Sequence, residues 1–262
     1  MYSLLCVDDM LIAANSMTEI NDLKELLSKE FDKKGLGEAK KILGMEIHRK
    51  NNEVHLSQKK YIEKVLQRFG MNKCKPVTLP LAQHFRLSSL MAPQSKVEVE
   101  YMSKVPYSSA VGSVMYAMVC TRPDIAQAVS VASRFMSNPS KTHREAIKWI
   151  LRYLKGSSNV GLTFCRIRNK GFSVLGYVDS DFVGDLDRRR STTGYIFTLA
   201  GSAISWKATL QSIVVLSTTE VKYMAAAEAA KEAIWLKGLV SELRKVQREP
   251  ECYSLDKKSE IS

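Results

Sequence analysis

The sequence lacks a long apolar run, and no stretch approaches the ~18 residues that a membrane span needs. We therefore expect no membrane partner. The apolar start, residues 1–7, leads directly into Asp8 and Asp9 without a basic flank or a cleavage site, which excludes a secretory signal peptide. Because the chain opens inside a strand-like apolar run, we interpret it as a segment of a longer protein.

Cysteine and histidine are few and unpatterned. The five cysteines are odd in number and scattered, with no CxxC pair, which excludes a disulfide framework or zinc knuckle and indicates an intracellular protein. The four histidines have no metal-ligand spacing. There is no internal repeat or low-complexity tract. We expect no small-molecule cofactor, and the oligomeric state cannot be inferred.

What is present is a globular composition with a basic excess. The 262 residues are 45% hydrophobic and 25% charged, enough for one large domain or two ordinary ones. There are 39 Lys and Arg residues against 27 Asp and Glu, a net charge of +12. Such an excess indicates a polyanionic partner, meaning nucleic acid or an anionic surface.

The pattern of apolar residues divides the chain into two structured parts. The first part is expected to hold a hairpin, a helix, a strand pair and a second helix, over residues 4–14, 17–31, 39–56 and 58–69. Four of the seven prolines fall within 76–106, which predicts a linker. The second part is expected to hold three helices, at 107–119, 123–136 and 140–154, then five strands, at 161–165, 172–178, 194–199, 203–206 and 212–216, and a helix over 218–244. The fold class is α+β or α/β.

Two groups of carboxylates are candidates for metal ligands. Asp8 and Asp9 lie at the predicted hairpin turn, where adjacent negative charges repel unless a cation such as Mg²⁺ compensates them; a solvated turn is the alternative. The second group is four acids within nine residues, which form either an ordinary acidic loop or a metal site, at Asp179, Asp181, Asp185 and Asp187.

The run Leu4-Leu-Cys-Val-Asp-Asp-Met-Leu-Ile12 resembles the Tyr-Val-Asp-Asp-Met box of reverse transcriptases in copia-type (Ty1/copia) LTR-retrotransposon Pol polyproteins. The resemblance continues in order along nearly the whole chain, including Thr121-Arg-Pro-Asp-Ile-Ala126, the acidic run 176–195, and Gln211 with the run 216–236. It implies the C-terminal part of such a polyprotein: palm and thumb over 1–75, a Pro-rich linker over 76–106, a helical connection over 107–160, and a truncated ribonuclease H-like mixed sheet with a long helix over 161–262.

By this resemblance, Asp8 and Asp9 correspond to metal ligands of the polymerase palm, and Cys6 occupies the position of the family's tyrosine. The family's fingers and its other palm aspartate precede the box, so they would lie before Met1. Two-metal phosphoryl transfer needs carboxylates from more than one strand. We therefore expect no polymerase activity from this chain alone.

The ribonuclease H-like domain of the family cuts the RNA strand of an RNA–DNA hybrid with two Mg²⁺ ions held by Asp and Glu side chains. The resemblance assigns its first ligand to Asp179 and, loosely, a third to Asp256. The helix ligand is replaced, because Lys222 stands where the family has glutamate. Glu220 lies about 200° away around the helix, and Glu228 lies about 9 Å along it, so neither can substitute. The chain also ends at Ser262, before the family's last acidic ligand. We expect an inactive site.

Basic side chains are the candidate contacts to nucleic acid. Residues 31–75 contain 12 Lys and Arg against 5 Asp and Glu, which a solvated helix surface would also explain. The candidates for phosphate contact are Lys59, Lys60, Lys64 and Arg68, with Arg188, Arg189 and Arg190 as a second group. Trp149, Trp206 and Trp235 lie on apolar stripes and are interpreted as core residues rather than base-stacking platforms.

Two functions remain open. The first is a catalytically inactive fragment of a reverse transcriptase and ribonuclease H that meets an RNA–DNA hybrid or primer–template duplex. The alternative is a non-catalytic nucleic-acid-binding or interaction protein derived from the retroelement. The resemblance implies an intracellular location, in cytoplasmic virus-like particles or the nucleus.

Overall fold

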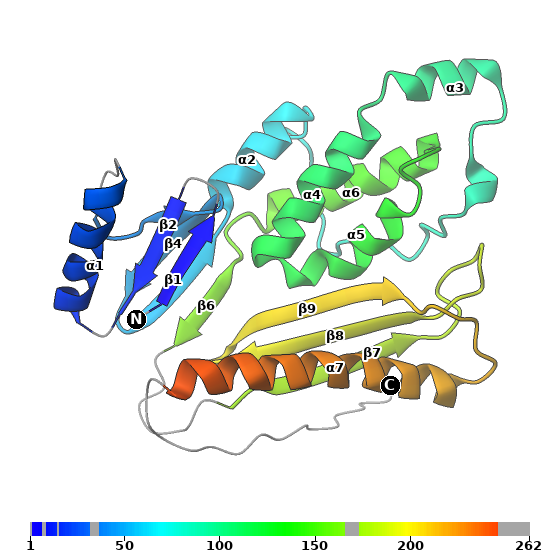
Figure 1. Cartoon of the computed structure of the whole chain (residues 1–262). Coiled ribbons are helices and arrows are strands. Elements are labelled where there is room, and N and C mark those ends of the chain that lie inside the picture. The colour runs from blue at the N-terminus through cyan, green and yellow to red at the C-terminus, as the bar shows by residue number, and fades with distance from the viewer. Residues whose placement is uncertain (1, 7–8, 15, 32–36, 166–172, 246–262) are drawn as a thin grey trace.

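The protein is a mixed α/β structure built from three antiparallel sheets and seven α-helices among the residues that the computed structural model describes, which are 2–6, 9–14, 16–31, 37–165 and 173–245. Figure 1 shows a hairpin and a helix at one end, a group of helices in the centre, and a three-stranded sheet covered by one long helix. The α+β character that the sequence predicts is therefore confirmed.

The N-terminal hairpin consists of β1 (Tyr2–Cys6) and β2 (Asp9–Ala13), paired from Tyr2 with Ala13 to Cys6 with Asp9. The predicted hairpin is thus correct, with two residues between its strands. Helix α1 (Met17–Glu30) follows, and the Ser16 hydroxyl caps its first turn by accepting the Thr18 N–H. Asp8 lies outside the described residues, and Asp9 begins β2.

A four-stranded sheet joins distant parts of the chain. Its strands, in spatial order, are β3 (Lys41–Ile42), β4 (Met45–Lys50), β5 (Glu53–Ser57) and β6 (Leu162–Cys165). Asn51 and Asn52 connect β4 to β5 with φ angles of 48° and 65°, as a tight hairpin turn with two left-handed residues requires. Strand β6, which the sequence assigned to the ribonuclease H-like part, pairs with β5 and so adds to the sheet of the N-terminal part.

The central helices enclose the largest apolar core. They are α2 (Lys59–Arg68), α4 (Tyr107–Thr121), a 3₁₀ turn (Pro123–Ile125), α5 (Ala126–Ser133) and α6 (Lys141–Gly156). Val111, Val114 and Ile150 are fully buried in this core. Each such side chain contributes about 1.5–3 kcal/mol by leaving water. The helix expected over 123–136 begins instead as a 3₁₀ turn at Pro123.

Two irregular segments differ from expectation. The predicted linker 76–106 contains a 3₁₀ turn (Ser89–Met91) and α3 (Lys96–Ser103). The strand predicted over 212–216 is wrong: this segment is an irregular connection in which Leu216 is 91% exposed. The apolar run favours a strand locally, but the backbone leaves the sheet here because Ser217 caps the following helix through the Glu220 N–H.

The C-terminal sheet has the order β7 (Leu175–Asp181), β8 (Thr192–Leu199) and β9 (Ser202–Leu210), and α7 (Thr218–Lys245) covers one face. Phe197, Ala229 and Leu236 form the core beneath that helix. The Trp206 indole N–H donates to the Met118 carbonyl and ties β9 to α4. All described strands pair antiparallel. The parallel pairing that a mixed sheet requires is not seen among them, so that part of the expectation stays a prediction. No described helix is long and apolar enough to cross a membrane.

Candidate functional site

Asp179 lies on β7, opposite Gly194 of β8, and its side chain is exposed. Its carboxylate accepts the N–H of Ser180 at 2.8 Å. Helix α7 packs on this strand and on β8. The side chain predicted as a metal ligand is therefore exposed on a strand against which α7 packs.

A buried amide positions the first turn of α7 beside that strand. The Gln211 side-chain N–H₂ donates to the Thr193 hydroxyl and to the Val221 carbonyl, each at 3.0 Å. Thr193 pairs across the sheet with Ser180, the neighbour of Asp179. Gln211 therefore places the residue after Val221, which is Lys222, at the same end of the sheet as Asp179. Sequence reasoning named Gln211 within the resemblance but assigned it no role.

The orientation of Lys222 follows from its neighbours on α7. Val221 and Ala225 are buried against the sheet, and Lys222 is exposed. Glu232 marks the flank of α7 that faces β9, because its carboxylate accepts the Ser205 hydroxyl at 2.7 Å. Successive helical residues are about 100° apart, so Lys222 lies about 80° around the helix from Glu232, next to the buried face of Val221 and Ala225. Lys222 is therefore an exposed residue beside the helix face that packs on the sheet.

The two neighbouring glutamates are engaged elsewhere. Glu220 accepts the Leu216 N–H at 3.1 Å, at the very start of the helix. Glu228 pairs with Lys231 at 2.7 Å, and this hydrogen bond and charge lower the pKa of Glu228. The expectation that neither residue replaces the missing glutamate stays a prediction.

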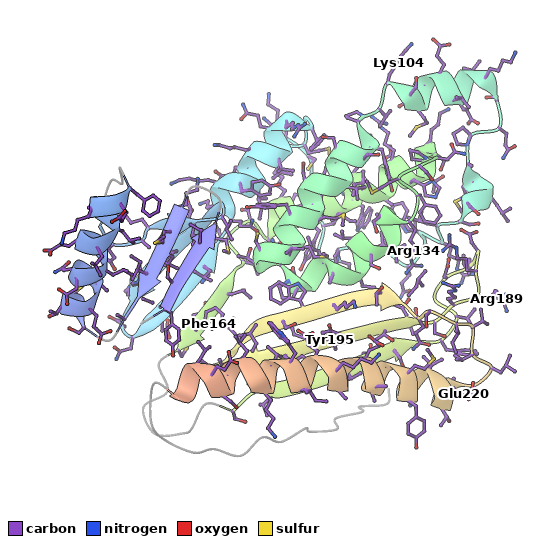
Figure 2. All side chains as sticks on the ribbon, in the orientation of Figure 1. Lys104, Arg134, Phe164, Arg189, Tyr195 and Glu220 are labelled. Atoms are coloured by element: carbon purple, nitrogen blue, oxygen red, sulfur yellow. The ribbon has the colours of Figure 1, made fainter. Side chains whose placement is uncertain are left out.

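The rest of the acidic cluster holds two parts of the molecule together. Asp185 is buried and forms an ion pair with Arg134 at 3.8 Å, and Figure 2 shows Arg134 at the end of α5 beside the loop of Arg189. Asp187 accepts the Ser88 hydroxyl at 2.5 Å and the Ser89 N–H at 2.7 Å. Burial raises the pKa of Asp187, but these hydrogen bonds outweigh it and leave the pKa below its usual value.

The described residues therefore do not fit the expected Mg²⁺. Asp185 and Asp187 are already bound to residues of the helical region. The described chain contains no group of three or more His, Cys, Asp or Glu side chains arranged to hold a metal ion. Asp8 and Asp256 lie outside the described residues, and only the backbone of Asp9 is described. Their assignment as ligands stays a prediction.

Removing Arg134 is expected to loosen this connection. The Arg134→Ala change leaves the Asp185 carboxylate buried without a cation, and we expect the free energy of unfolding to fall by about 2 kcal/mol. Urea denaturation measures this loss, and hydrogen exchange should rise in residues 182–190. The control is Arg144→Ala, which removes an exposed pair with Glu145 and should cost about 0.5 kcal/mol or less. Equal losses would contradict the assignment.

The predicted phosphate contacts on α2 share its exposed surface. Lys59, Lys60, Lys64 and Arg68 are all exposed, opposite a buried face of Ile62, Val65 and Leu66. Lys60, Lys64 and Arg68 recur every four residues and form one stripe. Lys60 also pairs with Glu46 at 2.9 Å, and the hydrogen bond raises its pKa. The charges of Lys64 and Arg68 are free of such an ion pair among the described residues.

The second basic group is not beside the first. Arg188 and Arg189 are exposed in the loop from β7 to β8, and Arg190 is half-buried. Figures 1 and 2 show this loop at the far end of the C-terminal sheet from α2, with α4 and α5 between them. Only a ligand that extends across the central helices could contact both groups.

The sequence did not predict the polar network around the buried side chain of Arg122. The guanidinium of Arg122, fully buried, donates to both oxygens of Asp124 at 2.9 and 2.6 Å, and to the carbonyl and hydroxyl of Ser157 at 2.9 and 2.6 Å. The Tyr153 hydroxyl donates to Asp124 at 2.8 Å. The Thr-Arg-Pro-Asp run quoted for the resemblance therefore ties the start of the 3₁₀ turn to the end of α6.

Two of the three tryptophans are not core residues. Trp235 is 59% exposed on α7, so its interpretation as core is wrong. Trp149 is only partly buried and lines a surface cleft on α6. Trp206 is half-buried between β9 and α4. Helical periodicity alone did not reveal that α7 carries large apolar side chains that stay exposed.

Comparison with known proteins places the chain among retrotransposon sequences. Residues 3–83 match the family model described as "Reverse transcriptase (RNA-dependent DNA polymerase)". The chain is 54% identical over 252 residues to the "Retrovirus-related Pol polyprotein from transposon TNT 1-94" of Nicotiana tabacum, covering 95% of this chain and 19% of that protein. It is 38% identical over 253 residues to the corresponding polyprotein from transposon RE1 of Arabidopsis thaliana, covering 96% and 17%.

The chain also matches a shorter relative, and it covers most of that protein's length. The chain is 31% identical over 233 residues to the "Putative transposon Ty5-1 protein" of Saccharomyces cerevisiae, covering 88% of this chain and 73% of that protein. By contrast, the chain spans about a fifth of the length of the two Pol polyproteins. No solved structure matches the chain significantly.

Proposed function

The chain belongs to the family of copia-type retrotransposon Pol polyproteins, and from this premise we propose that it binds an RNA–DNA hybrid or primer–template duplex without cutting it. In this proposal, residues 1–75 are the end of a palm and thumb, 107–160 are a connection, and 161–262 are a ribonuclease H-like domain. The β1–β2 hairpin supplies the polymerase box remnant, Asp8 and Asp9. A location in virus-like particles or the nucleus stays a prediction.

The single observation that carries the proposal is the exposed basic stripe on α2, which we combine with the proposal that Lys222 stands in place of a metal ligand. Lys64 and Arg68 present unpaired charges on α2, among the described residues, at a spacing that can follow a phosphate backbone. In this proposal Lys222, near the start of α7, places a positive charge where the family's mechanism requires a carboxylate. Binding can therefore survive where cleavage does not.

The salt dependence of binding tests the first half of this proposal. We expect log K for a labelled hybrid to fall linearly with log salt, because each phosphate contact releases counterions. The double variant Lys64→Gln, Arg68→Gln should lower the magnitude of that slope by about 1.8. Fluorescence anisotropy between about 50 and 200 mM salt measures both quantities.

The matched control is Lys96→Gln with Lys104→Gln, which removes the same charge from exposed positions at the start of α3 and directly after its end. Its slope should stay close to that of the unmodified chain. If the chain binds no hybrid or duplex at low salt, the proposal fails. If it binds but both double variants behave alike, the α2 stripe is not the contact.

A further inference from the structure

A surface cleft on α6 combines aromatic rings with basic side chains. It has a volume of about 420 Å³ and is lined by Met71, His84, Phe85, Glu145, Lys148, Trp149 and Arg152. We call it the α6 cleft. Its volume lies within the range of small-ligand sites, and it is separate from the α2 stripe and from the sheet that carries Asp179.

The walls of the α6 cleft are held rigid by side chains one turn apart. The Trp149 indole N–H donates to the Leu79 carbonyl at 3.0 Å, and Arg152 Nε donates to the Lys75 carbonyl at 2.7 Å. One turn further on, Lys155 donates to the Cys74 carbonyl at 2.5 Å. These bonds fix the segment 74–79 along α6, so a ligand would find the site already formed.

The rings in the α6 cleft suit a flat aromatic ligand. His84 and Phe85 have ring centroids 4.3 Å apart, and both meet Trp149 edge-on at 5.6 and 5.7 Å. The Arg152 guanidinium lies 4.8 Å above the Trp149 ring. His84 is exposed although it is part of this aromatic group. Such a set of faces and edges stabilises a stacked base without reading its identity.

The charges of the α6 cleft favour an anionic group on that ligand. Lys148 and Arg152 contribute two positive charges, and Glu145, which pairs with Lys148 at 3.0 Å, contributes one negative charge. Arg152 uses only Nε for the Lys75 carbonyl, and its terminal nitrogens have no hydrogen-bond partner among the described residues. A nucleotide combines such a flat ring with a phosphate.

The position of the α6 cleft relates it to the basic stripe. Helix α2 ends at Arg68, Gly70 follows with a φ of +66°, and the Met71 N–H then donates back to the Leu66 carbonyl at 2.7 Å. This bond holds Met71, part of the cleft lining, against the last turn of α2, which carries Arg68. Helices α2 and α6 pack side by side (Figure 1). A strand that follows the stripe would therefore reach the cleft.

We infer that the α6 cleft binds an unpaired base of single-stranded nucleic acid, with the base against Trp149 and His84 and its phosphate at Arg152 and Lys148. The base must be unpaired, because both faces of a base within a duplex are covered by its neighbours. This site goes beyond the duplex contact proposed for α2 and can exist without it.

The test compares a labelled twelve-residue oligothymidylate with an abasic oligomer of the same length and charge, using the full chain at low salt. The unmodified chain should bind the abasic oligomer about 10-fold more weakly. The Trp149→Leu variant should lose about 10-fold for oligothymidylate and should no longer distinguish the two oligomers. Duplex binding should not change in this variant. The matched control is Trp235→Leu, on exposed α7, which should behave like the unmodified chain.

A second variant keeps the test decisive if Trp149→Leu fails to fold, as circular dichroism would reveal. His84→Ala alters an exposed residue of the cleft and should cost about 3-fold or more for oligothymidylate with little change for the abasic oligomer. Equal binding of the two oligomers to the unmodified chain would overturn the inference. A folded cleft variant with undiminished preference for oligothymidylate would also overturn it. Loss of duplex binding alone bears on the α2 stripe and leaves the cleft unaffected.

Discussion

The Asp124→Asn variant is expected to lower the free energy of unfolding by about 3 kcal/mol. Arg122 is fully buried, and its guanidinium depends on the carboxylate of Asp124 for its countercharge. Neutralising Asp124 leaves that charge in the interior with only the neutral acceptors of Ser157. Removing one partner of a buried ion pair costs far more than the pair itself contributes. Urea denaturation followed by circular dichroism measures the loss.

The matched control neutralises an exposed acid. Glu100→Gln breaks a pair with Lys104 in which both side chains are 74% exposed, and it should change stability by about 0.5 kcal/mol or less. Comparable losses in the two variants would show that burial of Arg122 does not set the cost. We therefore expect the larger loss of stability in Asp124→Asn because its ion pair is buried and that of Glu100 is exposed.

The same pair predicts a pH dependence with a definite sign. Burial raises the pKa of Asp124, but the hydrogen bonds and charge of Arg122, with the Tyr153 hydroxyl, outweigh it and hold the pKa below the ordinary 3.8. A carboxyl with a depressed pKa in the folded state stabilises the fold above its unfolded pKa. Its contribution is lost as the pH falls through the folded value. The stability difference between the unmodified chain and Asp124→Asn should therefore shrink below about pH 4.

The Lys222→Glu variant should gain Mg²⁺ affinity by at least about 10-fold, because it replaces a repelling ammonium with an oxygen ligand beside the strand of Asp179. The unmodified chain should not cleave a labelled RNA–DNA hybrid with Mg²⁺ or Mn²⁺, whereas Lys222→Glu should gain cleavage if the remaining ligands are in place. Isothermal titration of Mg²⁺ and a gel assay of the hybrid measure the two effects.

Two further variants separate coordination from simple charge. Lys222→Gln removes the ammonium without adding a carboxylate, so it should gain less Mg²⁺ affinity than Lys222→Glu. Adding Asp179→Asn to Lys222→Glu should remove the gain, because coordination needs both side chains. Cleavage by the unmodified chain that Asp179→Asn abolishes would refute the proposed inactivity.

Local patterns predicted the elements whose periodicity is strong. The apolar spacing over 58–69 predicted α2, which buries Ile62, Val65 and Leu66, and the paired apolar runs predicted the β1–β2 hairpin. The pattern failed over 212–216, where β-branched residues form no strand, and at Trp235, where an apolar stripe stays exposed. In both cases the outcome depends on whether a partner element is present, which a local pattern does not record.

The family of the chain could be obtained from the residues alone, because motifs keep their order and type along a sequence, and the same motifs led to the proposal that Lys222 replaces a glutamate. The residues alone could not show which carboxylates are free to bind a metal ion. Asp187 is bound by Ser88, 99 residues away, and Asp185 by Arg134, so an acidic cluster that suggests a metal site serves instead to join the sheet to the helices. The α6 cleft likewise brings Met71, His84 and Trp149 together only on folding. Distant residues meet through packing, and the availability of a charge or a ring is decided there.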